Sequence, residues 1–367
     1  MICFNMCVYS WFSLMKKIFI AIRDMTRERR RPACTFQKRR AVETRHALSL
    51  RFWFCKRLIF LSLILLSACG GKNTVDSDGN ITITDHVGRT VSFSKIPEKI
   101  ISLSPGTTEI IFALGLNPKL VGVTSFCDYP AEAESIDRIG GYSTVDKERV
   151  IDKIGADKDG AVIFASTLHA LPGGVLSDLE QLGYKVVVLE AKTIDQLIDS
   201  MKLVNKTCGG GPAADAVIRS IEDRVNAVKS KINAETLKVT VMHEVFSGHW
   251  IAGADTLEND IIAVAGGINV GASRGSGYGQ INNESIIDAN PDIVVIVSRM
   301  GVMINGLISS EITNNPIFRM LDAVKNRRVY VIDADIVSRS SPRAVDGLEE
   351  YAKILHPEIF GDPVLPR

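Results

Sequence analysis

Aromatic side chains stand in segments that should directly follow strands, and they are the residues best suited to hold a large, flat ligand. Rings offer rigid contact area at little cost in side-chain entropy. In an open parallel sheet, the carboxyl ends of the strands form the binding crevice. The pattern therefore predicts a cleft lined from several loops. The residues are Phe126, Tyr129, Tyr142, Phe246, Trp250 and Tyr278.

Reactive chemistry has little support in the residue pattern. We expect no phosphate loop, no nucleophile elbow and no helix with paired metalloprotease histidines. The glycine-rich run 271–277 is not expected to follow a strand and open a helix, so we predict a flexible loop there. His243 and His249 are the closest pair of histidines, and no histidine after residue 80 has metal-ligand spacing with a carboxylate. We therefore predict no metal site and no catalytic residue.

The amino-terminal segment has the layout of an export signal. Arg51, Lys56 and Arg57 precede an apolar run at 58–68, which is too short to span a bilayer. The run ends in Leu-Ser-Ala before Cys69, which resembles a bacterial lipobox. Such a site implies cleavage before Cys69 and attachment of lipid to its sulfur, which would hold the protein at a membrane.

The segments on either side of this cysteine differ in character. We expect the polar stretch 70–79 to be a flexible tether. Residues 1–50 carry basic runs without a fold signal. We hypothesise that translation starts nearer Leu48 or Leu50.

The charge of the chain is unevenly divided. Of 43 Lys and Arg and 42 Asp and Glu, 14 and 3 respectively fall in residues 1–68. The remainder is therefore acidic, with a net charge of about −10. Phosphates require a basic surface, so this balance argues against a nucleic-acid partner.

The seven cysteines reduce to two after the predicted leader and lipid site are set aside. Cys127 and Cys208 could pair in an oxidising compartment. Two isolated cysteines are more often free or buried.

Short apolar runs alternate with amphipathic segments from residue 100 onward, which predicts an α/β fold whose parallel sheets are covered on both faces. A helix should begin at Pro105, with Glu109 in its favourable first turn. Strands are expected at 100–103, 120–124, 161–164, 185–189, 239–243, 292–297 and 328–332. Further helices are expected at 150–154, 175–182, 257–265, 317–324 and 344–355.

A long helical stretch separates the two sets of strands. One apolar stripe covers 194–204 and a second covers 217–232, with a Gly-Gly-Gly-Pro run between them. We therefore predict two Rossmann-like lobes with parallel sheets, joined by a long rigid helix that limits closure to a few degrees. The expected domains are a leader at 1–68, a lipidated tether at 69–80, an N-terminal lobe at 81–192, a connecting helical segment at 193–236 and a C-terminal lobe at 237–367.

An internal repeat supports this division. Residues 141–152 match residues 277–288, with identical Gly, Tyr, Glu, Ile and Asp at corresponding places. Coincidence between two ordinary helix openings is the alternative. A true repeat would place Tyr142 and Tyr278 in matching loops, and Glu148 and Glu284 at matching helix starts.

Four segments resemble the helical-backbone substrate-binding proteins of ABC importers. They lie at 99–109, 121–130, 290–296 and 339–343, and the resemblance covers roughly residues 81–360. The Asp-Tyr-Pro sequence that ends the second segment and the Arg-Ser-Ser-Pro-Arg of the fourth look most like the cobalamin-binding branch. The resemblance implies a cleft between two lobes that carries a transported ligand and needs no cofactor.

The resemblance also implies roles for single residues. Glu148 and Glu284 match two glutamates that dock each lobe onto arginines of a dimeric permease, where exposed ion pairs set register more than affinity. Tyr129 and Tyr142 would face a corrin from the first lobe, and Trp250 and Tyr278 from the second. The full expected ligand-binding set is Phe126, Tyr129, Tyr142, His169, Phe246, Trp250, Tyr278 and Arg339.

Two places depart from the cobalamin-binding pattern. The loop at 165–169 reads Ala-Ser-Thr-Leu-His where a further tryptophan can stand, and Ile336 stands where an aromatic residue is common. These departures leave the identity of the ligand open.

Three functional hypotheses follow from the sequence. The first is a monomeric, non-enzymatic lipoprotein, in the periplasm or on the outer face of the cell membrane, that delivers a corrinoid to an ABC permease dimer with a cytoplasmic ATPase. The second is the same fold carrying a ferric siderophore or haem, whose anionic groups Arg274, Arg299, Arg339 and Arg343 could match. The third is a chelatase or metallocluster enzyme, for which the two remaining cysteines are too few ligands.

Overall fold

The computed structural model of the protein describes residues 74–75, 80–170, 174–233, 236, 238–246, 248–298, 315–316 and 318–363. The chain divides into two compact units, residues 1–70 and 71–367, and every described residue belongs to the second. The predicted leader, Cys69 and Arg299 lie outside the described residues. The finer domain boundaries at 192 and 236 stay predictions.

The first large sheet, which defines the N-terminal lobe, contains four parallel strands in the order β5-β4-β6-β7. Its strands are almost wholly buried, as expected for a parallel sheet covered on both faces. The strands are β4 (Lys99–Ser102), β5 (Leu120–Val123), β6 (Ala161–Ser166) and β7 (Val186–Leu189). The helices and 3₁₀ turns are α3 (Pro105–Ala113), η1 (Asn117–Lys119), η2 (Ala131–Ser135), α4 (Lys147–Ile154), η3 (Thr167–Ala170) and α5 (Val175–Gln181).

The second large sheet, which defines the C-terminal lobe, has the order β11-β9-β8-β12-β13, with β10 also paired to β8. Its strands are β8 (Val239–Phe246), β9 (Trp250–Ala252), β10 (Gly267–Asn269), β11 (Tyr278–Gln280), β12 (Ile293–Ser298) and β13 (Val329–Asp333). Its helices and turns are α8 (Leu257–Val264), η4 (Val270–Arg274), α9 (Asn283–Ala289), η5 (Phe318–Met320), α11 (Asp322–Lys325), η6 (Ala334–Ile336), α12 (Ala344–Leu355) and α13 (Pro357–Phe360).

The predicted α/β architecture is confirmed, and one part of the prediction is wrong. Strands β9 and β11 pair antiparallel at the edge of the second sheet, which is therefore mixed rather than parallel. Phe246, Trp250 and Tyr278 consequently lie on strands instead of in loops. A three-residue strand carries too few residues for its alternation to be read from sequence.

A small antiparallel sheet precedes the first large one. It consists of β1 (Thr74–Val75), β2 (Ile81–Thr84) and β3 (Thr90–Phe93). The buried Asp85 carboxylate accepts a hydrogen bond from the backbone of Val188 at 3.1 Å, which holds this sheet to the end of β7. The prediction of a tether without structure is therefore wrong at residues 74–75, which pair with β2.

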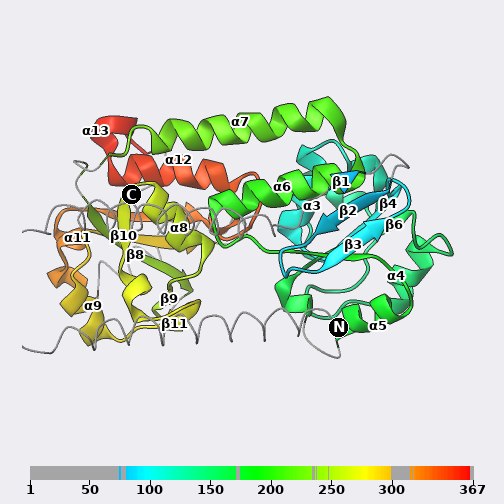
Figure 1. Ribbon diagram of the computed structural model, residues 1–367. Coiled ribbons are helices and arrows are strands. Elements are labelled where there is room, and N and C mark those ends of the chain that lie inside the picture. Colours follow the sequence, from blue (N-terminus) through cyan, green and yellow to red (C-terminus); the bar gives the residue numbers. More distant parts are fainter. Residues whose placement is uncertain are drawn as a thin grey trace, which may run out of the picture. The chain divides into compact units, whose positions relative to one another are not determined.

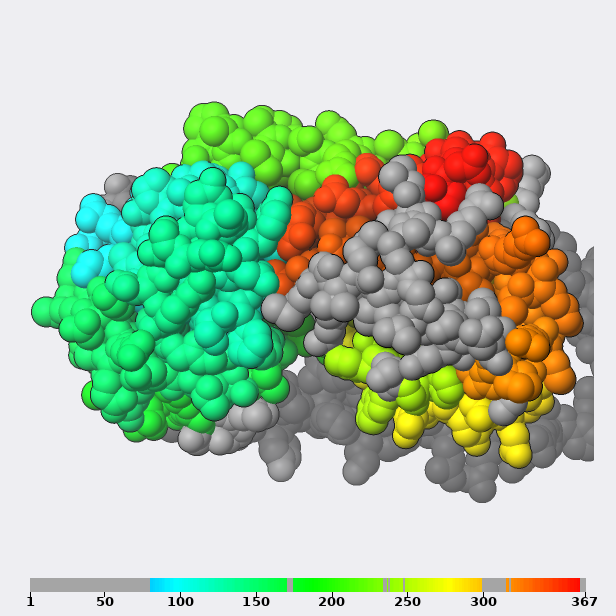
Figure 2. All heavy atoms as spheres, turned by 180° about the vertical axis from the view of Figure 1, so that it is seen from behind, coloured from blue at the N-terminus to red at the C-terminus, as the bar shows by residue number. Residues whose placement is uncertain are grey.

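Two helices, not one, connect the lobes. Helix α6 (Ile194–Cys208) begins where the backbone N–H of Ile194 donates to Asp260 of α8, and it ends where the Cys208 carbonyl accepts from Lys119 of η1. A left-handed glycine, Gly209, ends α6. Helix α7 (Gly211–Lys229) then runs back across both lobes, as Figures 1 and 2 both show. The Gly-Gly-Gly-Pro run that interrupts the predicted stretch is thus a full reversal of the chain.

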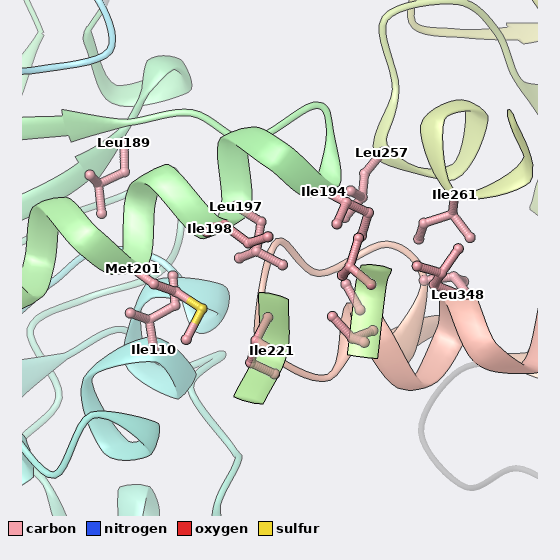
Figure 3. Packing of buried hydrophobic residues seen from close by; sticks show 14 of the residues in the cluster. Ile110, Leu189, Ile194, Leu197, Ile198, Met201, Ile221, Leu257, Ile261 and Leu348 are labelled. Carbon is pink, nitrogen blue, oxygen red and sulfur yellow. The ribbon is translucent and has the colours of Figure 1, made fainter. Parts of the chain in front are cut away.

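One hydrophobic core extends through both lobes and the two helices between them. Figure 3 shows α6 in the middle of this core, with its apolar stripe pointing toward residues of both sides. The labelled members are Ile110, Leu189, Ile194, Leu197, Ile198, Met201, Ile221, Leu257, Ile261 and Leu348. Two smaller clusters cover the opposite faces of the two sheets. The lobes therefore share packed side chains in addition to the chain that links them.

Cys127 and Cys208 are both free and buried, so the sequence alternative of a disulfide between them is not realised. Burial raises the pKa of the Cys208 thiol to about 12, which keeps it protonated. No helix among the described residues is long and apolar enough to cross a membrane.

Candidate ligand-binding site

A cavity of about 1020 Å³ is lined by residues of both lobes. Most of the lining segments come directly after a strand: 166–167 at the end of β6, 189–192 after β7 and 334–340 after β13. The start of α3 and the segments at 255–257 and 276–278 complete the wall. The predicted crevice at the carboxyl ends of the strands is therefore present as a cavity.

Hydroxyl groups are the most frequent polar groups in the wall of this cavity. Hydroxyls both donate and accept hydrogen bonds, so a wall of this kind suits uncharged polar groups such as amides. The lining serines and threonines are Ser104, Thr107, Ser143, Ser166, Thr167, Ser200, Thr256, Ser276, Ser338 and Ser340.

Three of the six predicted aromatic residues line the cavity: Phe126, Tyr142 and Tyr278. Phe126 is 59% exposed and Tyr278 is 50% exposed, so both rings present open surface. Phe126 and Tyr142 belong to the N-terminal lobe and Tyr278 to the C-terminal lobe. A flat ligand in the cavity can therefore meet rings from both sides.

Tyr142 is held in place by His169. The Nε2 of His169 lies 2.5 Å from the Tyr142 carbonyl oxygen, the two rings meet edge to face, and Nδ1 accepts from the backbone N–H of Ser166 at 3.2 Å. Both ring nitrogens are thus used inside the protein, and burial lowers the pKa of His169. His169 does not line the cavity; it supports a residue that does.

Tyr278 is anchored to a buried carboxylate. Its hydroxyl donates to Glu258 at 3.1–3.2 Å, and Glu258 lies in the first turn of α8 without exposed surface. A tyrosine fixed through its hydroxyl presents its ring face in a defined orientation. Glu258 has no counterpart among the residues predicted from sequence.

The remaining predicted aromatic residues lie outside the cavity wall. Phe246 and Trp250 are cross-strand partners in the β8–β9 hairpin, and both are more than 40% exposed. Tyr129 is also exposed, and the guanidinium of Arg343 stacks on its ring at 3.8 Å from the centroid. None of the three is among the lining residues. Their predicted role in ligand contact stays a prediction.

A cluster of five charged side chains joins the two lobes beside the cavity. From the C-terminal lobe, the Arg343 guanidinium donates two hydrogen bonds, of 2.7 and 2.8 Å, to the Glu109 carboxylate. Arg339 contacts Glu109 at 3.2 Å, Asp128 at 2.6 and 3.2 Å, and Asp335 at 2.9 Å. Glu109 on α3 and Asp128 belong to the N-terminal lobe, so the cluster ties the lobes together at their junction.

The pKa values in this cluster follow from its geometry. The hydrogen bond from Arg339 holds the pKa of Asp128 below its usual range, and the pKa of the Arg343 guanidinium is raised by its bond to Glu109. Burial raises the pKa of Asp335. All three carboxylates lie within 3.2 Å of Arg339, and Glu109 also pairs with Arg343. The two arginines are therefore matched by carboxylates of the protein and do not form a free cationic patch.

The position predicted for Glu109 in the first turn of its helix is wrong. Glu109 does not lie in the first turn of α3, and its side chain is only 2% exposed. Helix α3 begins at Pro105, so Glu109 falls one turn further along and faces the C-terminal lobe's arginines. No local signal in the sequence connects it to residues that stand 230 and 234 positions away.

The formal charge of the cavity wall is negative. Four acidic residues and two basic ones line it. The two cations are both paired, Arg339 with the carboxylates described above and Lys192 with Glu190 at 3.1 Å. Of the other arginines proposed for an anionic ligand, the two in the described part of the chain do not line the cavity: Arg343 stacks on Tyr129, and Arg274 donates to the Ser285 carbonyl.

Glu148 and Glu284 occupy matching positions in the two lobes. Both are exposed in the first turn of a helix, α4 and α9 respectively. Asp146 caps α4 by accepting from the N–H of Arg149, and Asn282 caps α9 by accepting from the N–H of Ser285. The helix starts of the sequence repeat therefore have the same local structure in both lobes. Its two tyrosines do not lie in matching loops, because Tyr142 lies outside the strands and Tyr278 lies on β11.

The glycine-rich run differs from its prediction. Residues 270–274 form η4 directly after β10, and the following backbone is bonded to β9 and its extension, from Gly253 to Gly277 at 2.7 Å and from Ala254 to Gly275 at 2.8 Å. The run does contain a Gly-x-Ser-x-Gly spacing at 271–275. The Ser273 hydroxyl donates to the Val270 carbonyl in the same turn, so this spacing forms a tight turn and not an activated nucleophile.

No group of three or more His, Cys, Asp or Glu side chains in the described part of the chain is placed to hold a metal ion. The tight contacts that the structure describes at the cavity are thus those of hydroxyls, rings and paired charges.

Comparison with known proteins places the chain in a family. Residues 100–336 match the Periplasmic binding protein family. An uncharacterized ABC transporter substrate-binding lipoprotein of Bacillus subtilis is 28% identical over 317 residues, covering 82% of this chain and 96% of the relative. A vitamin B12-binding protein of Vibrio cholerae is 25% identical over 273 residues, covering 70% and 89%.

Solved structures share the fold. The periplasmic vitamin B12-binding protein of Vibrio cholerae has a TM-score of 0.61 at 23% identity, covering 70% of this chain and 96% of its own. Periplasmic heme-binding proteins share the fold as well, with one from Pseudomonas aeruginosa at a TM-score of 0.60. The resemblance seen in the sequence is confirmed, and the chain belongs to the periplasmic binding protein family, with the fold of the helical-backbone substrate-binding proteins of ABC importers.

Proposed function

We propose that the chain is the extracytoplasmic receptor of an ABC importer and carries cobalamin or another corrinoid in the cavity between its lobes. One observation carries the choice of ligand: the cavity wall combines three rings and many hydroxyls with cations that are already paired. A corrin is a large flat ring whose periphery carries neutral amides. Hydroxyls bond such amides, and rings pack on the flat faces.

The comparisons support the same class of function. The relatives include a protein named as a substrate-binding lipoprotein of an ABC transporter and proteins named for vitamin B12 binding. Proteins of this class deliver a small ligand to a permease dimer driven by a cytoplasmic ATPase. We infer that this chain does the same as a monomer, without a catalytic step and without a cofactor of its own.

Heme is the second candidate, because heme-binding proteins share the fold. Heme carries two propionates, and a buried carboxylate needs a cation that is free to pair with it. Both cations in the described wall are engaged by carboxylates of the protein. The charge of the wall therefore favours the corrinoid over heme or an anionic ferric siderophore.

The ligand is tested with residues 71–367, which form one compact unit. Trp250 is the only tryptophan in that unit, so its fluorescence reports on the C-terminal lobe. We expect a calorimetric signal and a change in fluorescence with cyanocobalamin and cobinamide, and a weaker signal with hemin or a ferric catecholate complex. No signal with either corrinoid would reject the proposal, and preferential binding of hemin would replace it with the second candidate.

Docking to the permease is a separate part of the proposal. Glu148 and Glu284 are exposed at equivalent helix starts, one in each lobe, which suits a permease with two-fold symmetry. Replacing both with Arg should abolish uptake while leaving ligand affinity unchanged. The matched control is the double variant Asp152→Arg and Asp288→Arg, one turn along the same helices, which should retain uptake.

Membrane attachment through Cys69 completes the proposal. We expect the wild-type chain to incorporate radiolabelled palmitate and to sediment with membranes. A Cys69→Ala variant that is still lipidated would contradict this attachment site.

A further inference from the structure

Arg339 stands in the cavity wall, where an arginine would normally recruit a carboxylate-bearing ligand. Its hydrogen-bonding groups are instead occupied by the protein. Its Nε forms an ion pair with Asp335 at 2.9 Å, and Nη1 donates to Glu109 at 3.2 Å. The two terminal nitrogens also donate to the Asp128 carboxylate, Nη1 to Oδ1 at 2.6 Å and Nη2 to Oδ2 at 3.2 Å.

Asp128 differs from the other two partners in its position. Glu109 is buried, with 2% of its side chain exposed. Asp335 also lines the cavity, but it lies four positions from Arg339 in the same lobe and contacts the guanidinium at Nε, away from its outer edge. Asp128 itself lines the cavity, and 42% of its side chain is exposed. Its two oxygens take the paired geometry on the outer edge of the guanidinium that a ligand carboxylate would need.

We propose that Asp128 is a specificity determinant that excludes carboxylate-bearing ligands by occupying the edge of Arg339 that such ligands would bind. This inference rests on the proposed function, since it concerns which members of a ligand class the cavity accepts. The exclusion has two parts: the Asp128 carboxylate repels a second carboxylate, and it leaves Arg339 without a free pair of donors. Asp128 would thus contribute to specificity by weakening the binding of ligands that carry a carboxylate.

The test compares Asp128→Asn with Asp255→Asn. Both residues line the cavity, and both substitutions remove one negative charge with almost no change of shape. Asp255 accepts a hydrogen bond from the Ser276 hydroxyl at 2.9 Å and binds no arginine side chain in the described contacts. Its backbone has a φ of 57°, which asparagine tolerates at least as well as aspartate. Asp255→Asn therefore changes the charge of the wall without releasing a guanidinium.

The ligands are a matched pair. Cyanocobalamin is compared with its monocarboxylates, in which one peripheral amide is replaced by a carboxylate and the ring is unchanged. Affinities for the full chain and both variants are measured by calorimetry, and the readout is the ratio of the carboxylate dissociation constant to that of the amide. We expect Asp128→Asn to lower this ratio by about fivefold or more for at least one monocarboxylate, as one partly exposed charge pair allows. Asp255→Asn should change it by about twofold or less.

The outcomes separate this inference from the proposed function. If the wild-type chain binds cyanocobalamin and Asp128→Asn leaves the ratio unchanged, or changes it no more than Asp255→Asn does, the inference is overturned and the proposed function stands. If the wild-type chain binds no corrinoid, the proposed function fails, and hemin becomes the probe. Tighter hemin binding by Asp128→Asn than by the wild type and Asp255→Asn would then support the role of Asp128, and equal binding would overturn it.

Discussion

Glu109 and Asp128 are bound by the same arginine but in different surroundings. The Glu109 side chain is 2% exposed and contacts both Arg339 and Arg343, whereas the Asp128 side chain is 42% exposed. Removing one partner of a buried ion pair leaves the other charge without compensation in a poorly solvated place. An exposed partner is replaced by water at little cost. Glu109 should therefore matter for stability and Asp128 mainly for selectivity.

We expect Glu109→Gln to lower the free energy of unfolding by about 3 kcal/mol or more, because it leaves two arginines without their buried carboxylate. The matched control is Asp346→Asn. Asp346 pairs with Arg224 at 2.6 Å, but its side chain is 47% exposed, so the control should cost about 1 kcal/mol or less. Urea unfolding of residues 71–367 measures both. Equal losses for the two variants would show that the Glu109 cluster does not stabilise the junction.

The stability of the protein should depend on pH through its buried histidines. Burial lowers the pKa of His243 to about 3, and its Nδ1 hydrogen-bonds with the buried Tyr351 hydroxyl. The unfolded chain takes up a proton at His243 near pH 6.5, while the folded chain does not. The unfolded state thus binds more protons below that pH, so the free energy of unfolding should fall as pH falls from 6.5 toward 5. Buried His169 adds to the fall in the same direction.

The change of unfolding free energy with pH distinguishes the protonation of His243 from a loss of stability that is the same at every pH. One histidine contributes at most about 1.4 kcal/mol per pH unit. A His243→Asn variant should be less stable at every pH, but its stability between pH 6.5 and 5 should fall less steeply than that of the wild type. Parallel stability curves would contradict the assignment of this pH dependence to His243.

At the scale of elements, the segment 270–278 links the edge of the second sheet to the cavity. It passes so close to β9 that a side chain at Gly271 would place its Cβ 2.0 Å from the Ala252 carbonyl oxygen. Its last residues, Ser276 to Tyr278, line the cavity. The position of Tyr278 in the wall therefore depends on an approach of two backbones that only glycine permits.

We expect Gly271→Ala to displace this segment, to lower stability by about 2 kcal/mol or more and to weaken ligand binding by about tenfold. Gly279→Ala is the control, because a Cβ added at this position of the adjacent strand would meet no atom within 4 Å. We expect Gly279→Ala to change both the stability and the ligand affinity only slightly. Thermal unfolding and calorimetry measure the two effects. A tolerated Gly271→Ala would mean that the segment can move away from β9 without cost.

The elements also show what the sequence could and could not predict. Long apolar runs such as 293–298 are strands in the structure, because buried parallel strands are apolar throughout. The repeat correctly placed Glu148 and Glu284 at helix starts, since capping is local. The sequence pattern did not predict the short antiparallel strands β9 and β11, nor the pairing of Arg343 with Glu109. Both depend on contacts between distant segments, which no local periodicity encodes.

At the scale of the whole molecule, stiffness follows from the shared core. Met201 and Leu197 of α6 pack in the same cluster as residues of both sheets, and Ile221 of α7 joins them. Arg224 of α7 donates to Glu349 of α12 with two hydrogen bonds of 2.8 Å, which adds a polar link on the surface. Close-packed interfaces resist continuous deformation. Large closure on ligand binding would require this core to open.

We therefore expect ligand binding to change the separation of the lobes by no more than about 3 Å. Spin labels at Asp152→Cys on α4 and Asp288→Cys on α9 measure it in residues 71–367, at exposed and equivalent positions of the repeat. Cys127 and Cys208 are buried and should not react with the label. Met201→Ala in the same background should lower stability by about 2–5 kcal/mol and broaden the measured distances, because it opens a cavity in the core that both lobes share. If cyanocobalamin changed the distance between the two labels by about 10 Å in the chain that retains Met201, the connection between the lobes would be a flexible hinge. That result would contradict the inference that α6 and α7 hold the two lobes in a fixed arrangement.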